Sequence, residues 1–275
     1  MANHLISETP KDEDFYMHAH SYLEIFCLLS GDIDYSVEGY RYPMQPGDLA
    51  ITRKNEAHHV VLRSHARFDR MYVQFEIPTI GDLDPNGKLY VPFLERPLGK
   101  CNLYKASLFP EQRWAYYLEK ICAYEEEYDR LYYLLIVLKE LEECFDTVVA
   151  DKQVQETDRV AAVMKYINKH ISEEMTLGML AERFQLSTTH LNKLFKESAG
   201  TTVWQYIIAK RLITARERIL AGAAPTKVYQ NCGFQDYTTF YRAYKQHFGI
   251  SPKSDGRGVG IKGNDTVGQI YTFKL

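Results

Sequence analysis

The stretch HAHSYLE, residues 18–24, places His18, His20 and Glu24 within seven positions. Imidazole nitrogens and a carboxylate are ligands that zinc and iron accept, so this spacing could bind a divalent metal. The same groups could instead hydrogen-bond a polar small molecule, and buried histidines with satisfied partners also serve a purely structural role. Spacing alone leaves these three interpretations open.

The geometry of an extended chain limits how these side chains can meet. On one straight strand His20 and Glu24 would lie about 13 Å apart, too far for both to reach one ion. The site therefore requires a bend at Ser21–Tyr22. Further along, His58 and His59 are neighbours, and neighbours on a strand point to opposite faces, so only one of them can join the site.

Short strand-like stretches separated by turns occupy residues 15–76 and would position this site. They are LEIFCLLSG, DIDYSVEG, YRYPMQPGDLAIT, HHVVLRS and RFDRMYVQFE. Regular spacing of this kind predicts an all-β sandwich or barrel. After Pro110 the apolar residues recur at helical spacing, first over 114–122 and then over 131–148. Two long helices therefore follow, which could cover the barrel or pair between two subunits.

The chain of 275 residues is long enough for two domains, and its charge divides them. Residues 1–155 hold 16 Lys and Arg against 26 Asp and Glu, a net charge of −10. Residues 156–257 hold 15 against 9, a net charge of +6. The polar stretch ADKQVQETD, residues 150–158, lies at the change of sign and predicts a linker. Only the second half is expected to meet a polyanion.

Several features indicate a cytoplasmic protein. The apolar runs are much shorter than the roughly 20 residues of a membrane-spanning helix, and the first residues lack the pattern of a secretory signal. The five cysteines are odd in number and scattered, as is typical of reduced thiols: Cys27, Cys101, Cys122, Cys144 and Cys232.

The basic half contains a repeat. STTHLNKLFKESAG, residues 187–200, aligns with DYTTFYRAYKQHFG, residues 236–249, at an offset of 49. Ser187 and Asp236 can each cap a helix N-terminus, and a glycine closes each copy. A short helix precedes each copy, over 176–184 in the first, so each unit has the outline of a helix-turn-helix.

In a helix-turn-helix the second helix places its exposed face in the DNA major groove. The first copy would present short polar groups and one base to the groove: Thr188, Thr189, Asn192 and Lys193. A merely solvated helix face is the alternative, and two copies favour DNA. Residues 202–221 predict a connecting helix of roughly 30 Å, close to the ~34 Å between successive major grooves on one side of DNA, with Trp204 in its core.

These motifs resemble the DNA-binding domain of the AraC/XylS family of bacterial transcription regulators. The resemblance covers residues 157–257 and lies in TLGMLAERFQLSTTHLNKLFKESAGTTVWQYI, KRLITARERIL and GFQDYTTFYRAYKQHFGISP. It implies that two sets of residues contact bases or flanking phosphates: Thr188, Thr189, Asn192 and Lys193, and Tyr237, Thr238, Tyr241 and Arg242. Arg242 is the strongest candidate, because a guanidinium can read guanine with two hydrogen bonds.

The sequence departs from the family pattern in the second motif. Pro225 stands where a branched aliphatic residue is usual, and Tyr229 stands where alanine is usual. Asp255 and Gly256 precede Arg257 where the family has an aromatic residue. We therefore expect different packing of the second motif and a shortened final helix.

The first half resembles a cupin, the barrel that commonly serves this family as a sensor. The resemblance lies in His18-x-His20, Glu24, Gly31, PGDLAI at 46–51, and His58. In metal-binding cupins the matching three histidines and glutamate are ligands. Fusion to a DNA reader favours binding of a small effector over catalysis, because a regulator needs affinity that differs between two conformations. We expect no cofactor and no catalytic residue, and an effector site of His18, His20, Tyr22, Glu24 and His58.

The resulting prediction is a two-domain regulator. The predicted parts are a cupin-like effector-binding barrel over 1–108, a helical dimerisation segment over 109–149, a linker over 150–157, a double helix-turn-helix domain over 158–257, and a flexible tail over 258–275. Its expected partners are double-stranded DNA, a small effector such as a sugar or metabolite, a second copy, and RNA polymerase if it activates. The alternative is a metal-dependent cupin enzyme fused to a helical protein-interaction module.

Overall fold

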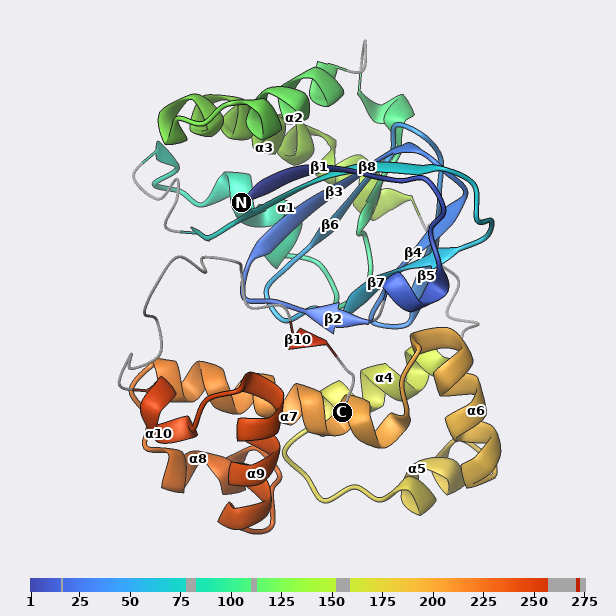
Figure 1. Ribbon diagram of the computed structural model, residues 1–275, viewed down its shortest axis with the longest axis vertical. Helices are drawn as coiled ribbons and strands as arrows, with labels where there is room; N and C mark the ends of the chain where they lie inside the picture. The colour runs from blue at the N-terminus through green and yellow to red at the C-terminus, as the bar shows by residue number, and fades with distance from the viewer. Residues whose placement is uncertain (16, 78–82, 110–112, 152–158, 257–270, 273–275) are drawn as a thin grey trace. The chain divides into compact units, whose positions relative to one another are not determined.

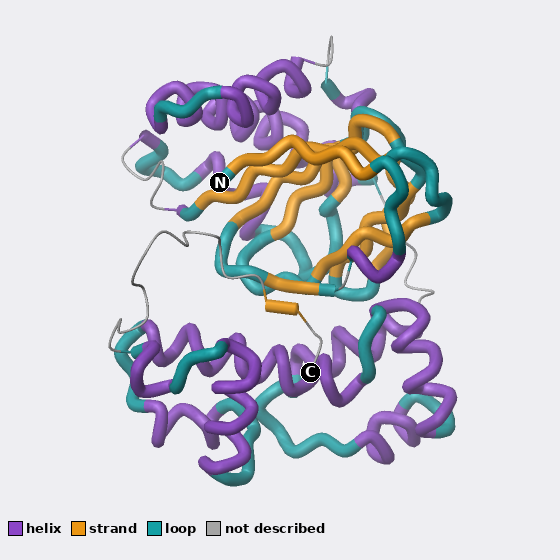
Figure 2. The backbone as a smooth tube through the Cα atoms, viewed as in Figure 1, coloured by secondary structure: helices purple, strands orange, loops and turns teal. Residues whose placement is uncertain are grey.

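The computed structural model describes residues 1–15, 17–77, 83–109, 113–151, 159–256 and 271–272 (Figure 1). The chain forms two compact units, one of residues 1–15 and 19–155 and the other of residues 16–18 and 156–275. The first is a β domain with appended helices and the second is helical (Figure 2). The predicted fold class is confirmed.

The β domain is built from two antiparallel sheets. One contains, in order, β1 (Ala2–Ser7), β8 (Phe68–Phe75), β3 (Leu23–Ser30), β6 (Leu49–Thr52) and β9 (Leu103–Tyr104). The other contains β2 (His18–Ala19), β7 (His58–Leu62), β4 (Ile33–Val37) and β5 (Tyr40–Met44) in that order. Short helical turns lie between strands: η1 (Asp12–Asp14), η3 (Lys88–Tyr90), α1 (Val91–Leu94) and η4 (Ala106–Leu108). The strands predicted from residue 15 onward are present, and β1 is an additional one.

Two helices cover the outer face of the first sheet, as Figure 1 shows. They are α2 (Arg113–Ala123) and α3 (Glu127–Ala150), and both contribute to one apolar core with the strands. Trp114 and Leu138 are almost fully buried there with Ile25 of β3. Because burying such large side chains is favourable by a few kcal/mol each, the helices belong to the β domain. α3 includes Ala150, one residue of the predicted linker, and 152–157 lie outside the described residues.

Seven helices make up the described part of the second unit. They are α4 (Arg159–Lys169), α5 (Leu177–Arg183), α6 (Thr188–Ala199), α7 (Val203–Leu220), α8 (Pro225–Asn231), α9 (Tyr237–Phe248) and α10 (Pro252–Asp255). The predicted caps are confirmed. Ser187 accepts a hydrogen bond from the His190 amide and Asp236 one from the Thr239 amide, while Gly200 and Gly249 end their helices in the left-handed conformation.

The ends of this unit differ in part from expectation. α10 has only four residues, which agrees with a shortened final helix. Trp204 is 48% exposed, so its predicted place in the core of the connecting helix is wrong. The middle of α7 is buried on all sides instead, since every residue from 206 to 213 is buried. A two-residue strand, β10 (Tyr271–Thr272), interrupts the predicted flexible tail, whose other residues lie outside the described part.

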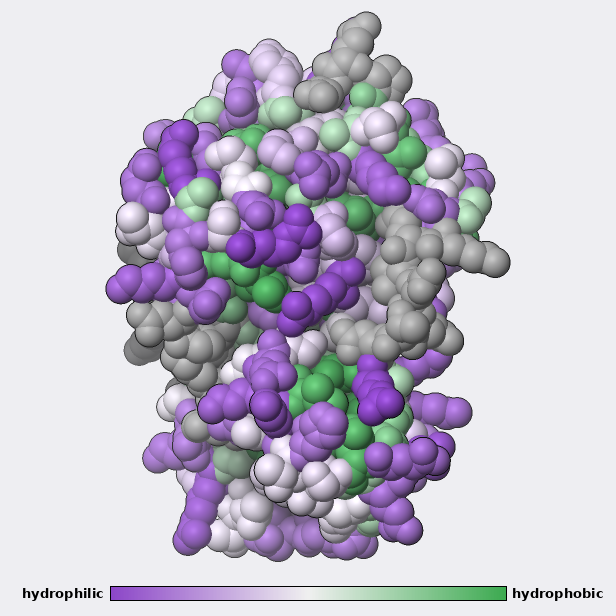
Figure 3. Space-filling model, turned by 90° about the vertical axis from the view of Figure 1, so that its right-hand side faces the viewer, coloured by the Kyte–Doolittle hydropathy of each residue, from purple (hydrophilic) through white to green (hydrophobic). Residues whose placement is uncertain are grey.

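In the described ranges no helix combines the length and the apolar composition needed to cross a lipid bilayer. Hydrophilic residues cover most of the face shown in Figure 3.

Candidate nucleic-acid interface and ligand site

The eight residues predicted to contact DNA lie on the second helix of each motif, α6 and α9. Five of them are exposed in the first half of these helices: Thr188, Thr189, Lys193, Thr238 and Arg242. The Lys193 side chain is 71% exposed and its only close acidic neighbour in the described part is Glu197 at 3.9 Å. An exposed pair at that distance is weak, so Lys193 remains available to a phosphate or a base.

The other three predicted contacts have structural roles as well. The Asn192 side-chain oxygen accepts a hydrogen bond from the Val203 amide at 3.3 Å, which helps to satisfy the start of α7. Tyr237 packs against Tyr229 and Tyr241, with ring centroids 5.7 and 6.2 Å apart. Tyr229, the departure from the family pattern, therefore fills the space beside the second recognition helix with an aromatic cluster.

The two recognition helices bury equivalent residues. α6 buries Leu191 and Phe195, and α9 buries Phe240 and Tyr244 at the repeat offset. Burial of one face fixes which side chains the opposite face presents. The structure therefore supports the alignment of the two motifs from which the contacts were predicted.

In the barrel, the predicted ligand residues come together. One nitrogen from each of His18, His20 and His58 lies within 4.8 Å of the others. Residues 21–22 form a bend between β2 and β3, and the His20 Nε2 atom lies 3.0 Å from the Glu24 Oε2 atom. The predicted bend is confirmed, and His58 rather than His59 belongs to this histidine cluster.

Hydrogen bonds orient two of the rings. His20 Nδ1 lies 3.1 Å from the Tyr22 carbonyl oxygen, and His58 Nδ1 lies 2.7 Å from the Glu56 carbonyl oxygen. A carbonyl can only accept, so each Nδ1 carries the proton and donates. In a neutral ring Nε2 is then a lone-pair acceptor facing Glu24, at 3.0 Å from His20 and 3.5 Å from His58. Two acceptors face each other favourably when a proton or another positive group lies between them.

Neutral donors already hold the Glu24 carboxylate in place. The Tyr35 hydroxyl donates to Oε1 at 2.9 Å, and the Gln74 side-chain nitrogen donates to Oε2 at 2.7 Å. Burial, with the nearby Glu24 charge, raises the pKa of Tyr35, so its hydroxyl keeps its proton and remains a donor. Tyr22, predicted to line the effector site, contributes its main-chain carbonyl to His20.

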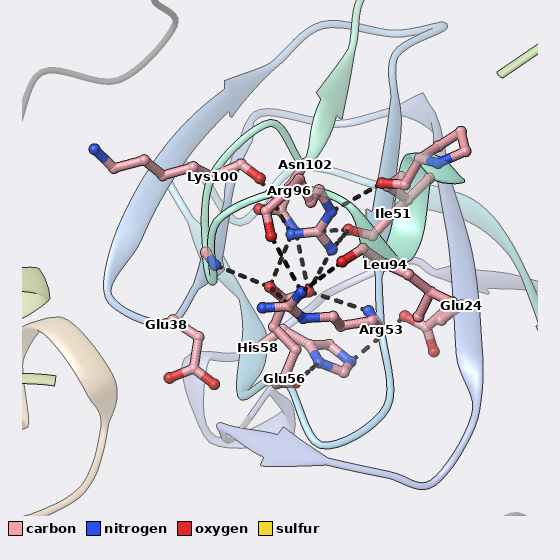
Figure 4. A network of polar contacts seen from close by, with 12 residues as sticks. Glu24, Glu38, Ile51, Arg53, Glu56, His58, Leu94, Arg96, Lys100 and Asn102 are labelled. Carbon is pink, nitrogen blue, oxygen red and sulfur yellow. Dashed lines mark hydrogen bonds and ion pairs between the residues drawn. The ribbon is translucent and has the colours of Figure 1, made fainter. Parts of the chain in front are cut away.

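A second buried network centres on Glu56, whose main-chain carbonyl contacts His58 (Figure 4). The Glu56 carboxylate accepts from both terminal nitrogens of Arg96, at 2.8 and 2.6 Å. It also accepts from the amides of Gly99 and Arg53 and from the Asn102 side chain. Burial alone would raise the pKa of Glu56, but the Arg96 charge and these hydrogen bonds outweigh it and lower the pKa to about 2.

Sequence reasoning did not identify Gln74, Glu56 or Arg96. Each meets its partner across 40 or more positions of sequence, with no local spacing to indicate the contact. Arg96 lies in the segment ERPLGKCNLY. The one signal for its role is that an arginine in a buried segment needs hydrogen-bond acceptors, which here come from Glu56.

The donor set fits a divalent metal in chemical type. Three imidazoles and one carboxylate suit zinc or iron, and the carbonyls of Tyr22 and Glu56 fix the orientation of the His20 and His58 rings. His18, His20 and His58 are the residues that would hold such an ion, and the Glu24 carboxylate lies beside the last two of them. The same residues offer a polar organic ligand several acceptors, with the Tyr35 hydroxyl beside them.

Comparisons with known proteins agree with both halves. Residues 180–257 match a helix-turn-helix domain family and residues 5–72 match a cupin domain family. The transcriptional activator RhaS of Pectobacterium carotovorum is 30% identical over 44% of this chain and 43% of its own. The probable transcriptional regulator LumQ of Photobacterium leiognathi is 30% identical over 37% of this chain and 41% of its own. The matches thus span less than half the length of these relatives.

Among solved structures, ToxT from Vibrio cholerae with bound unsaturated fatty acid aligns over 93% of this chain and 94% of its own, at 13% identity with a TM-score of 0.40. The family matches place the two motifs and the barrel where the geometry has them. The chain carries an AraC-type helix-turn-helix domain in its second unit and a cupin domain in its first.

Proposed function

We propose that this protein is a sequence-specific DNA-binding transcription regulator that senses a small effector in its cupin barrel. The observation that carries the proposal is the repeated helix-turn-helix, which presents exposed Thr188, Lys193 and Arg242 from a basic unit. Polar and basic side chains at the start of a recognition helix suit base edges and phosphates. The relatives with activator names support the same class.

The effector would bind at the histidine cluster of the barrel. Its acceptors and the Tyr35 hydroxyl suit a small molecule with several hydrogen-bonding groups, such as a polyol or another polar metabolite. The effector would bind one conformation of the protein more tightly than another and so shift the equilibrium between them, without being converted to a product. We propose no enzymatic activity for the chain, and a cytoplasmic location where it can reach DNA.

A second copy of the chain would pair through α2 and α3. Exposed apolar and aromatic side chains on α3 are typical of such a surface: Tyr128, Tyr132, Ile136 and Val149. A dimer would favour two repeated half-sites in the DNA. RNA polymerase would be a further partner if the protein activates transcription.

Selection of bound fragments from the host's genomic DNA by the full-length protein tests this proposal. A recurring motif is expected, with affinity that falls as salt rises because bound phosphates release counterions. Arg242→Ala should weaken binding to the selected duplex by about 1–3 kcal/mol, roughly fivefold to 150-fold in Kd. Lys193→Ala should weaken it as well and, if it contacts a phosphate, reduce the salt slope by about one.

Lys88→Ala is the matched control, because Lys88 is an exposed lysine of η3 in the β domain, outside α2, α3 and both motifs. Its removal should leave DNA affinity within the error of the measurement. Full affinity in both the Arg242 and Lys193 variants would refute the assignment of the recognition faces. Failure to recover any motif would refute the proposed function itself.

A divalent metal is the second candidate for the occupant of the barrel, favoured by the three histidine nitrogens within 4.8 Å. If the cluster takes an organic effector, EDTA should leave the thermal unfolding midpoint unchanged, because no bound ion is removed. A lower midpoint that zinc restores, and that His20→Ala no longer shows, would instead identify a metal site. Calorimetric unfolding of the full chain makes this measurement.

A further inference from the structure

Arg211, a buried arginine of the connecting helix α7, hydrogen-bonds to main-chain carbonyls that precede this helix in the sequence and to one that follows it. Arg211 lies in the middle of α7 and is 4% exposed. Its guanidinium donates to three main-chain carbonyls, from Nε to Ile171 at 2.9 Å, from Nη2 to Glu173 at 2.6 Å and from Nη1 to Gly233 at 2.7 Å. The distances to Ile171 and Gly233 are those of well-formed hydrogen bonds, and the distance to Glu173 is slightly shorter.

Two of these acceptors precede the first motif, and the third lies within the second. Ile171 and Glu173 lie between α4 and α5, in the segment that leads into the first helix-turn-helix. Gly233 lies in the turn between α8 and α9 of the second. Figure 1 shows α7 between the helices of the two motifs. A single side chain therefore holds the turn of the second motif and the approach to the first.

The turn at Gly233 is shaped to receive the guanidinium. Gly233 has φ +82, and a Cβ there would lie 2.7 Å from Arg211 Cζ. Glycine thus permits both the left-handed backbone and the close approach. The second motif meets α7 partly through this contact, beside the apolar cluster that includes Leu212 and Phe240.

A buried cation is a costly way to connect two motifs. Burial lowers the pKa of Arg211 because the charged form loses hydration. An apolar side chain of similar volume would avoid this cost and often gives equal or greater stability. The planar guanidinium, however, fixes the directions of its donors, so it constrains three acceptors relative to one another. That constraint on geometry is what an apolar residue would not supply.

We propose that Arg211 is a positioning residue that sets the placement of the second recognition helix relative to the first, so that both reach one DNA duplex. The inference rests on the proposed function, because it assigns Arg211 a role in DNA binding through α6 and α9. Arg211 itself does not contact DNA in this scheme. A variant without Arg211 should therefore still bind DNA, but with one of its two motifs in a major groove in place of both.

Hydroxyl-radical footprinting on a duplex from the genomic selection tests the inference. Within each half-site, the unchanged protein should protect two segments about one helical turn apart, one for each motif. Arg211→Lys keeps the positive charge but loses the fork of donors. Its footprint should retain one segment and lose the other, and its Kd should rise at least roughly tenfold, the equivalent of one lost base contact.

Two further variants separate positioning from general stability. Arg211→Met removes the charge and keeps a stem of similar length, and it should give the same one-segment footprint. It takes the place of the lysine variant if that variant fails to fold. Val163→Ala, in the buried face of α4, lowers stability but removes none of the three acceptors of Arg211, so it should keep both segments. All footprints are recorded well below each variant's unfolding temperature, measured by circular dichroism.

Two protected segments in both Arg211 variants would overturn the inference, as would a single segment with the unchanged protein. In either case DNA binding would still be present, and the proposed function would stand. Absence of any bound fragment would refute the proposed function instead. Loss of one segment in Val163→Ala as well would assign the effect to stability and also refute a positioning role.

Discussion

Replacing Glu56 by alanine is expected to destabilise the cupin domain by about 3–5 kcal/mol, because it leaves the Arg96 cation buried without its counterion. Both side chains are fully inaccessible to solvent, and the ion-pair distance is 2.6 Å. Arg96 would keep only carbonyl acceptors, including those of Pro92 and Lys100. Urea unfolding of the full chain, followed by a probe in the barrel, measures the loss.

The matched control is Asp32→Ala. Asp32 also pairs with an arginine, Arg63, at 2.9 Å, but 49% of the Asp32 side chain and 42% of the Arg63 side chain are exposed. Exposed pairs contribute up to about 1 kcal/mol, because water already solvates both charges. Similar losses from Asp32→Ala and Glu56→Ala would contradict the claim that burial makes the Glu56 contact strong.

The same pair predicts a dependence of stability on pH. The pKa of Glu56 is lowered from 4.5 to about 2 in the folded chain, so the unfolded chain binds a proton more readily. The contribution of Glu56 is therefore complete above pH ~4.5 and is lost as the pH falls towards ~2, about 3 kcal/mol in all. Glu56→Gln cannot titrate, so its stability should fall less over this window than that of the unchanged protein.

The parts of the fold that follow local rules were predictable from the sequence. Ser187 and Asp236 cap their helices and Gly200 and Gly249 end them, because capping depends on residues within one turn. The bend at Ser21–Tyr22 followed from the reach of two side chains on one strand. Repeat spacing located both motifs for the same reason, since each motif buries the same positions.

The parts that depend on distant partners were not predictable. The sequence of β1, ANHLIS, lacks the alternation of apolar and polar residues that marks a half-buried strand, and none of its residues is buried. Its position follows from pairing with β8. Trp204 is apolar enough for a core, but only the packing around α7 decides that this side chain is left exposed while residues 206 to 213 are buried. Gln74 reaches Glu24 from another strand, a contact that needs the sheet register. The candidate ligand residues were therefore predicted, and their supporting residues were not.

Gly233→Ala is expected to be the most damaging single methyl addition in the second motif. Left-handed backbone costs a residue with a Cβ about 1–2 kcal/mol, and Gly233 has φ +82. The new Cβ would also lie 2.7 Å from Arg211 Cζ and 2.8 Å from its Nη2 atom. The guanidinium is held by three hydrogen bonds, and charged hydrogen bonds contribute about 1.5–3 kcal/mol each, so moving it is costly. A total loss of roughly 3–4 kcal/mol follows.

Gly249→Ala separates the two causes. Gly249 has φ +71, and a Cβ added there meets no atom within 4 Å, so only the backbone cost of about 1–2 kcal/mol remains. Chemical denaturation of both variants, with the helical signal as the probe, gives the difference. A larger loss for Gly233→Ala assigns the excess to displacement of Arg211. Equal losses would mean that the guanidinium moves aside freely, and the contact between α7 and the turn of the second motif would then constrain neither.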